Sequence, residues 1–142
     1  MSVKRTPADI AFSKAIRESY DYTCCHCEVN YRHDPGYVHC AHIHTRKHRS
    51  TRWRAGAYPG AVALCAKCHR RFTDYPLEWA GWLKTYLGYE NYEECKRLAW
   101  SVRKYTKAEQ KEIAAHYRAQ TAYMERLRRE GRTGILPLVS WD

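Results

Sequence analysis

The chain of 142 residues has few of the side chains that usually fill an apolar core. It contains only two Phe and two Met, and its rings are mostly twelve Tyr and five Trp. No apolar run reaches the roughly 18 residues that a membrane-spanning helix requires, so no membrane partner is expected. At ~100–200 residues per domain, this length predicts one compact unit whose polar-tipped rings suit a wet groove as well as a core.

Acidic residues are missing from one long stretch. Between Pro35 and Thr73 there is no Asp or Glu, although the chain has 15 of them against 25 Lys and Arg. Five of the eight histidines lie there, together with eight basic side chains: Arg46, Lys47, Arg49, Arg52, Arg54, Lys67, Arg70 and Arg71. This one-sided charge, with a formal net charge of +10, favours nucleic acid as the partner, DNA or RNA. A solvated basic surface without a partner is the simpler alternative.

The pattern of a secretory signal is absent as well. The first twenty residues carry six charged side chains, which interrupt any apolar core of a leader. Seven cysteines are an odd number without a secretory context, so metal binding explains clustered thiols better than disulfides do. We therefore expect a cytoplasmic protein.

Capping signals and apolar periodicity predict helices at both ends of the chain. Thr6 followed by Pro7 predicts a helix to about Tyr20, and a strand is expected over 38–43 in a hairpin. Further helices are predicted over 65–72, 76–87 and 91–100, and a last, basic helix over 106–131. One stripe of the last helix has heptad-like spacing: Ile113, Tyr117, Gln120, Met124 and Leu127. The stripe predicts either packing on the rest of the chain or a homodimer interface.

Two cysteine pairs have the spacing of zinc knuckles. Cys24 and Cys27 form the first pair, and Cys65 and Cys68 form the second. Together they can supply the four sulfurs of a tetrahedral structural zinc, which contributes ~10–16 kcal/mol of apparent binding free energy to folding. Cys25 is an alternative ligand. Because four protein sulfurs leave no open coordination position, any chemistry must come from other residues.

A histidine-rich segment connects the knuckles, and one more histidine follows the second. The segment begins Cys40-Ala41-His42-Ile43-His44-Thr45-Arg46, and the second knuckle reads Cys65-Ala66-Lys67-Cys68-His69. In these motifs the chain resembles the HNH, or His-Me finger, endonucleases, and in particular the zinc-bound subgroup of phage lambda NinG (Rap)-like recombination endonucleases. The resemblance covers about residues 12–100.

The resemblance implies an α+β fold, in which a small zinc-stabilised ββα-metal core is flanked by an N-terminal helix and C-terminal helices. The nuclease domain would span 1–105, a basic helix for DNA arms or dimerisation 106–131, and a tail 132–142. The implied activity is metal-dependent hydrolysis of DNA phosphodiester bonds in branched recombination intermediates, such as Holliday junctions and D-loops. The implied location is the cytoplasm, that of the host cell if a bacteriophage encodes the chain.

The resemblance also assigns roles by position. His42 matches the general base that deprotonates the attacking water, and His69 matches a ligand of a catalytic magnesium or manganese ion. Arg46 and Arg52 would hold phosphates and neutralise charge in the transition state. All eight basic side chains of the acid-free stretch would bind DNA.

Two positions depart from the family pattern. The residue before the base is often a metal ligand, and here it is Ala41; the central Asn is also missing. His44 lies two residues from His42 and would share its side of a strand, so it is the first candidate to replace the ligand. A metal held by fewer protein groups and more water is the second possibility, and lost catalysis is the third. His39 and His48 are interpreted as surface residues.

Three functions therefore remain open. The first is the endonuclease for branched DNA, and the second is a general nicking or site-specific HNH endonuclease. The third is a non-catalytic zinc-stabilised nucleic-acid-binding module, which Ala41 favours. Such a module would bind DNA in a salt-dependent way without cutting it.

Overall fold

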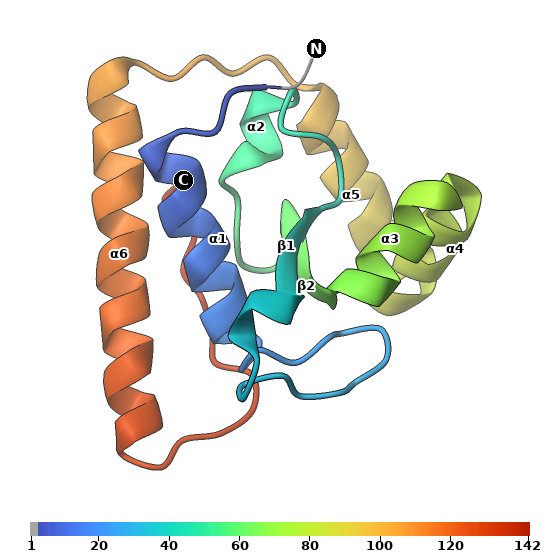
Figure 1. Cartoon of the computed structure of the whole chain (residues 1–142). Helices are drawn as coiled ribbons and strands as arrows, with labels where there is room; N and C mark the ends of the chain where they lie inside the picture. Colours follow the sequence, from blue (N-terminus) through green and yellow to red (C-terminus); the bar gives the residue numbers. More distant parts are fainter. Residues whose placement is uncertain (1–2) are drawn as a thin grey trace.

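The computed structural model describes residues 3–142, in which six α-helices surround one two-stranded antiparallel sheet (Figure 1). The elements in chain order are α1 (Pro7–Ser19), the 3-10 turn η1 (Pro35–Tyr37), β1 (Val38–His42), α2 (Arg49–Arg52), β2 (Ala61–Cys65), α3 (Ala66–Asp74), α4 (Pro76–Leu87), α5 (Tyr89–Trp100) and α6 (Lys107–Arg129). The mixed α and β composition expected from the sequence is thus confirmed. No helix in these described residues is both long enough and apolar enough to cross a membrane.

Local capping explains where α1 and α6 begin. The Asp9 N–H donates to the Thr6 hydroxyl at 3.3 Å, and the Thr6 N–H donates back to the Asp9 carboxylate at 2.7 Å. Thr106 and Glu109 form the same reciprocal capping box at the start of α6. Each box satisfies backbone donors that a helix leaves free in its first turn, so both starts were predictable from sequence.

Helices α1 and α6 lie side by side and share one core (Figure 1). Ile113, Tyr117 and Met124 of the α6 stripe are at most 1% exposed, and the Tyr117 ring meets Phe12 of α1 edge-on at 5.0 Å. The stripe is therefore used inside the chain.

The C-terminal tail docks on the same core. Leu136 and Leu138 are buried, and the Leu136 N–H donates to the carbonyl of Ser19 at 2.8 Å while the Ser19 hydroxyl donates back at 2.6 Å. α6, which spans Lys107–Arg129, and the tail consequently pack as part of the body of the protein.

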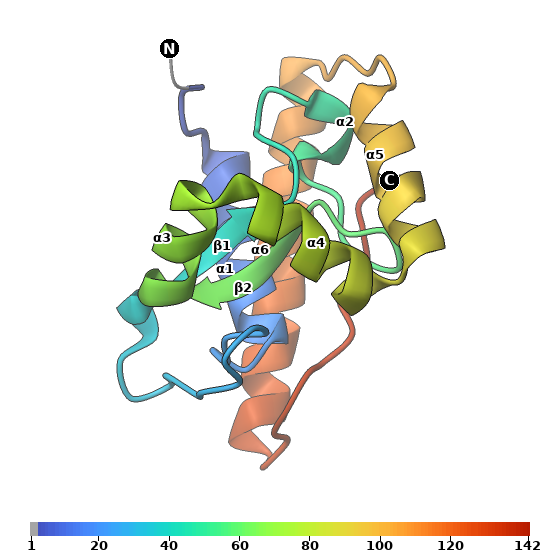
Figure 2. The same ribbon diagram turned by 90° about the vertical axis from the view of Figure 1, so that its right-hand side faces the viewer.

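The sheet lies between two layers of helices. Figure 2 shows α3 and α4 in front of it and α1 and α6 behind. β1 pairs antiparallel with β2, with Val38 opposite Cys65 and His42 opposite Ala61, and β2 leads directly into α3. Alternate residues of β1 therefore face α1 or α3, which decides where each histidine of the strand points.

Candidate metal centre and basic cleft

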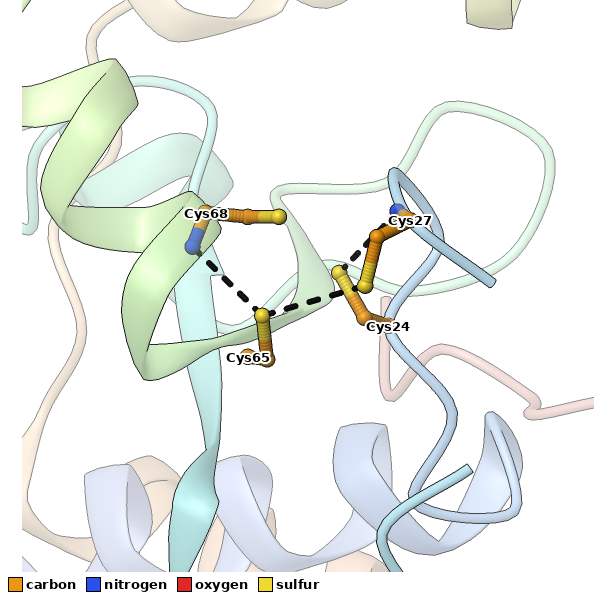
Figure 3. A group of neighbouring side chains, drawn as sticks. All are labelled: Cys24, Cys27, Cys65 and Cys68. Atoms are coloured by element: carbon orange, nitrogen blue, oxygen red, sulfur yellow. Dashed lines mark hydrogen bonds between the residues drawn. The ribbon is translucent and has the colours of Figure 1, made fainter. Parts of the chain in front are cut away.

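Four cysteines converge at the end of the sheet. Cys24 and Cys27 lie in the loop after α1, Cys65 ends β2, and Cys68 lies in the first turn of α3 (Figure 3). Their sulfur atoms all lie within 4.8 Å of one another. This places together the residues of the two predicted knuckles, and Cys25 is not part of the group.

In each pair, the backbone turns so that both sulfur atoms lie on the same side, toward the centre of the cluster. The Cys27 N–H points at the Cys24 sulfur at 3.5 Å, and the Cys68 N–H points at the Cys65 sulfur at 3.4 Å (Figure 3). Between the pairs, the Cys27 and Cys65 sulfurs are 3.9 Å apart. Two sulfurs about 2.3 Å from a tetrahedral zinc would be separated by about 3.8 Å, so the donor set and spacing fit structural zinc.

Sequence reasoning missed one neighbour of this cluster. Nδ1 of His26 lies 3.2 Å from the Cys68 sulfur, and the His26 ring packs edge-on against Phe72 and Trp82. Burial raises the pKa of Cys24 and of Cys68, whereas hydrogen bonds to its sulfur lower the pKa of Cys65. A ring N–H beside a sulfur is a typical outer contact that orients a metal ligand.

A separate basic cleft of about 330 Å³ opens between α1 and β1. The α1 side contributes every fourth residue: Arg5, Asp9, Ser13 and Arg17. The other wall is formed by Gly36, Val38, His39, Cys40, His42 and Arg46. Arg5 and Arg17 were missed as functional candidates because they lie outside the acid-free stretch. Their spacing of twelve, with polar residues at each intervening fourth position, was the available signal.

His42 lies in the wall of this cleft with a defined tautomer. Its Nε2 is 3.0 Å from the carbonyl oxygen of Arg52, and because a carbonyl only accepts, Nε2 carries the proton. Nδ1 is then the basic nitrogen of the ring. Burial lowers the pKa of His42 below 6.5. The hydrogen bond to the Arg52 carbonyl and the nearby Asp9 carboxylate raise the pKa, but by less than burial lowers it. The imidazole is therefore neutral at pH 7.

The structure gives Arg52 a different position from the expected phosphate contact. Its guanidinium is bound to the Asp9 carboxylate through Nε at 2.9 Å and Nη2 at 2.6 Å, and only 8% of its side chain is exposed. Trp53 also donates to Asp9 at 3.0 Å. Burial would raise the pKa of Asp9, but hydrogen bonds from Arg52 and Thr6 lower it, so the carboxylate is charged. Arg52 thus holds the loop whose carbonyl orients His42.

Arg46 remains at the cleft, whereas His44 does not. Arg46 lines the cleft and donates to the Val3 carbonyl at 2.9 Å. The His44 ring packs instead near His48 and Trp100, at centroid distances of 5.9 and 6.2 Å. β1 ends at His42, so the alternation expected to align His44 with it does not continue. His44 is not brought into the cleft as the replacement ligand.

His69 lies on α3 against a histidine that the sequence analysis treated as surface. Nδ1 of His69 is 3.0 Å from Nδ1 of His39 on β1, and the two rings meet at 76°. His39 also lines the cleft, whereas His69 is not among the residues that line it. Burial lowers the pKa of both rings. The charge of Arg17 lowers the pKa of His39 further, and His39 in turn lowers the pKa of His69.

The other basic candidates are spread over different surfaces. Lys67, Arg70 and Arg71 line a second groove of about 620 Å³ that borders the cysteine cluster. Lys47 and Arg49 are exposed, and Arg54 is half-buried with Nε donating to the Ser50 carbonyl at 3.3 Å. The eight basic side chains predicted to bind DNA therefore do not all line one hollow.

The fold and the cysteine cluster define a small mixed α and β protein with a four-cysteine metal site that fits structural zinc. Comparison with known proteins adds no family: no family model, curated protein or solved structure matches the chain.

Proposed function

We propose that the protein is a metal-dependent endonuclease that hydrolyses phosphodiester bonds in DNA. The observation that carries the proposal is the placement of His42: a neutral imidazole, held in one tautomer, lies in the wall of a cleft that three arginines also line. A base beside concentrated positive charge is what hydrolysis of a phosphodiester requires.

His42 acts as the general base in this proposal. The Arg52 carbonyl accepts a hydrogen bond from the protonated Nε2, which leaves Nδ1 free to accept a proton from a water molecule. A pKa below 6.5 keeps the ring unprotonated at neutral pH, as a base must be before the reaction. As Nδ1 takes the proton, the carbonyl stabilises the imidazolium through the Nε2 hydrogen bond.

The arginines bind the scissile phosphate. Arg5, Arg17 and Arg46 line the cleft, and the Arg46 guanidinium is anchored there by the Val3 carbonyl at 2.9 Å and the Asp9 carboxylate at 3.5 Å. Guanidinium forks bind phosphate oxygens in pairs, and their charge stabilises the additional negative charge of the transition state. Arg52 is not part of this set, because Asp9 occupies its guanidinium.

The order of elements supports the same proposal. A hairpin is followed at once by a helix, with His42 on the first strand and His69 on the helix, which is the order of the ββα-metal core that the motifs resemble. His69 would hold the catalytic divalent ion beside the cleft. Such an ion supplies charge stabilisation to the leaving oxygen.

Branched recombination intermediates are the proposed substrate, as the NinG-like motifs imply. Basic residues outside the cleft are available for additional DNA arms: Lys67 and Arg70 of α3, and Arg118, Arg126 and Arg129 of α6, are exposed. Contacts of this kind add affinity without reading sequence, which suits recognition by shape.

A non-catalytic nucleic-acid-binding module is the second candidate, and one observation favours it. Of the ten described residues that line the cleft, only Asp9 has a carboxylate, and Arg52, Trp53, Thr6 and Arg46 already occupy it. The cleft thus offers no free carboxylate to a metal ion.

Cleavage of three DNA forms separates these functions. The zinc-loaded protein is incubated with a fixed four-way junction, a D-loop and a matched linear duplex, each with magnesium, manganese or EDTA. The proposal predicts metal-dependent cutting of the branched forms in preference to the duplex. Equal cutting of all three forms indicates a general nicking enzyme, and binding without cutting under every ion indicates the non-catalytic module.

A further inference from the structure

The contact between His39 and His69 requires something between the two rings. Their Nδ1 atoms are 3.0 Å apart, and each ring nitrogen is a donor or an acceptor according to its tautomer. Two lone pairs at this distance repel each other unless a proton or a cation lies between them. The pair joins β1 to α3 across thirty residues of sequence, so local chain geometry does not force it.

The distance suits a shared metal ion. Two nitrogens about 2.1 Å from one ion and 3.0 Å apart subtend about 90° at that ion, the angle between neighbouring ligands of an octahedron. His39 is exposed and lines the cleft, so water and a phosphate oxygen can reach the remaining positions. The other residue on that face of β1, Ala41, has no donor atom and is buried.

We propose that His39 and His69 together hold the catalytic ion, with His39 supplying the ligand that Ala41 cannot. Two imidazoles without a carboxylate favour a borderline transition-metal ion over Mg²⁺, which takes oxygen ligands. The ion is therefore a divalent transition metal, completed by water and substrate phosphate, and Mn²⁺, the most weakly bound of that series, serves as its paramagnetic probe. The assignment of catalysis rests on the proposed nuclease function, but ion binding by the pair does not.

Electron paramagnetic resonance of Mn²⁺ tests the site without DNA. Zinc-loaded protein is titrated with Mn²⁺, and the sharp signal of the free ion measures what is bound. We expect one Mn²⁺ per wild-type chain and at least a tenfold weaker affinity in His39→Ala and in His69→Ala. His33→Ala, which removes an exposed histidine near Tyr31, should bind Mn²⁺ like the wild type. An equal concentration of Mg²⁺ should leave the Mn²⁺ bound.

A measurement on the wild-type chain removes dependence on how the variants fold. Bound Mn²⁺ should broaden the imidazole nuclear magnetic resonance signals of His39 and His69 more than those of His33 and His116. Broadening of other histidines instead, affinity unchanged in both variants, or displacement by equal Mg²⁺ would overturn the assignment. Mn²⁺ bound at the pair without any DNA cleavage would keep the metal site and reject the nuclease.

Discussion

Asp9 and Arg52 connect the start of α1 to the proposed base, His42. The Asp9 carboxylate binds the Arg52 guanidinium, and the backbone carbonyl of Arg52 accepts a hydrogen bond from the Nε2–H of His42. Asp9 and Arg52 are both less than 10% exposed, so neither is free to contact substrate. Asp9 therefore acts on His42 only through the loop, as a positioning residue.

Replacing Asp9 should destabilise the protein strongly. Asp9→Ala leaves the buried Arg52 cation without its partner, which costs about 3–5 kcal/mol of unfolding free energy. Urea unfolding measures this loss. Glu78→Ala is the matched control, because it breaks an exposed ion pair with Arg71 that water already screens, and its midpoint should barely change. Equal shifts in both variants would contradict the role given to Asp9.

The pH dependence of cleavage should report His42. Its folded pKa is lowered below 6.5, so the base is deprotonated throughout the neutral range. The single-turnover rate should be flat between about pH 7 and 8 and fall only below pH 6.5. Because the unfolded chain binds the proton more tightly, stability should fall over the same acid range. A rate midpoint above pH 7 would be inconsistent with this base.

Elements that depend on local signals were predictable, whereas contacts between distant elements were not. The N-cap Thr6 followed by Pro7, and the capping box that begins at Thr106, correctly placed the starts of α1 and α6, since each signal is complete within four residues. The cysteine spacing likewise predicted the cluster. The Asp9–Arg52 and His39–His69 contacts join residues 43 and 30 positions apart, and no local pattern specifies them.

The outcome at His44 shows the same limit. Its spacing from His42 predicts a shared side only while the strand continues, and β1 ends at His42. The heptad-like stripe of α6 had two interpretations for a similar reason, because an apolar helix face does not specify what covers it. In the structure the stripe packs against α1.

The cysteine cluster makes a direct prediction at the scale of the knuckles. Cys65→Ser removes one of four sulfurs and should lose the bound zinc, together with much of the stability. Cys25→Ser is the matched control, since that thiol neighbours Cys24 but lies outside the cluster, and it should retain one zinc per chain. Atomic spectroscopy of the purified proteins measures the zinc content. Full zinc content in Cys65→Ser would count against the site.

At the scale of the whole molecule, some arginines are held in ion pairs with buried carboxylates, whereas others line the open cleft. Arg52 and Arg128 are occupied by buried carboxylates, Asp9 and Glu18 respectively, while Arg5 and Arg17 line the open cleft. A count of basic residues in the sequence therefore does not define the proposed DNA-binding cleft. Its arginines, Arg5, Arg17 and Arg46, are a smaller and differently placed set than the eight basic side chains of the acid-free stretch.

The salt dependence of DNA binding tests that division. Arg17→Ala should reduce the slope of log affinity against log salt by about 0.9, because it removes one phosphate contact. Arg97→Ala is the control, since Arg97 on α5 pairs with Glu94 outside the cleft, and it should keep the wild-type slope. Binding isotherms on one duplex at several salt concentrations give both slopes. Identical slopes for wild type and Arg17→Ala would remove Arg17 from the DNA surface.

Cleavage of a four-way junction by His42→Ala tests the central claim most directly. The variant is compared with wild type and with His33→Ala in the presence of manganese, after zinc content and DNA affinity have been matched. Loss of a general base predicts a rate at least 10²-fold lower in His42→Ala and an unchanged rate in His33→Ala. Cleavage by His42→Ala at the wild-type rate would contradict the account.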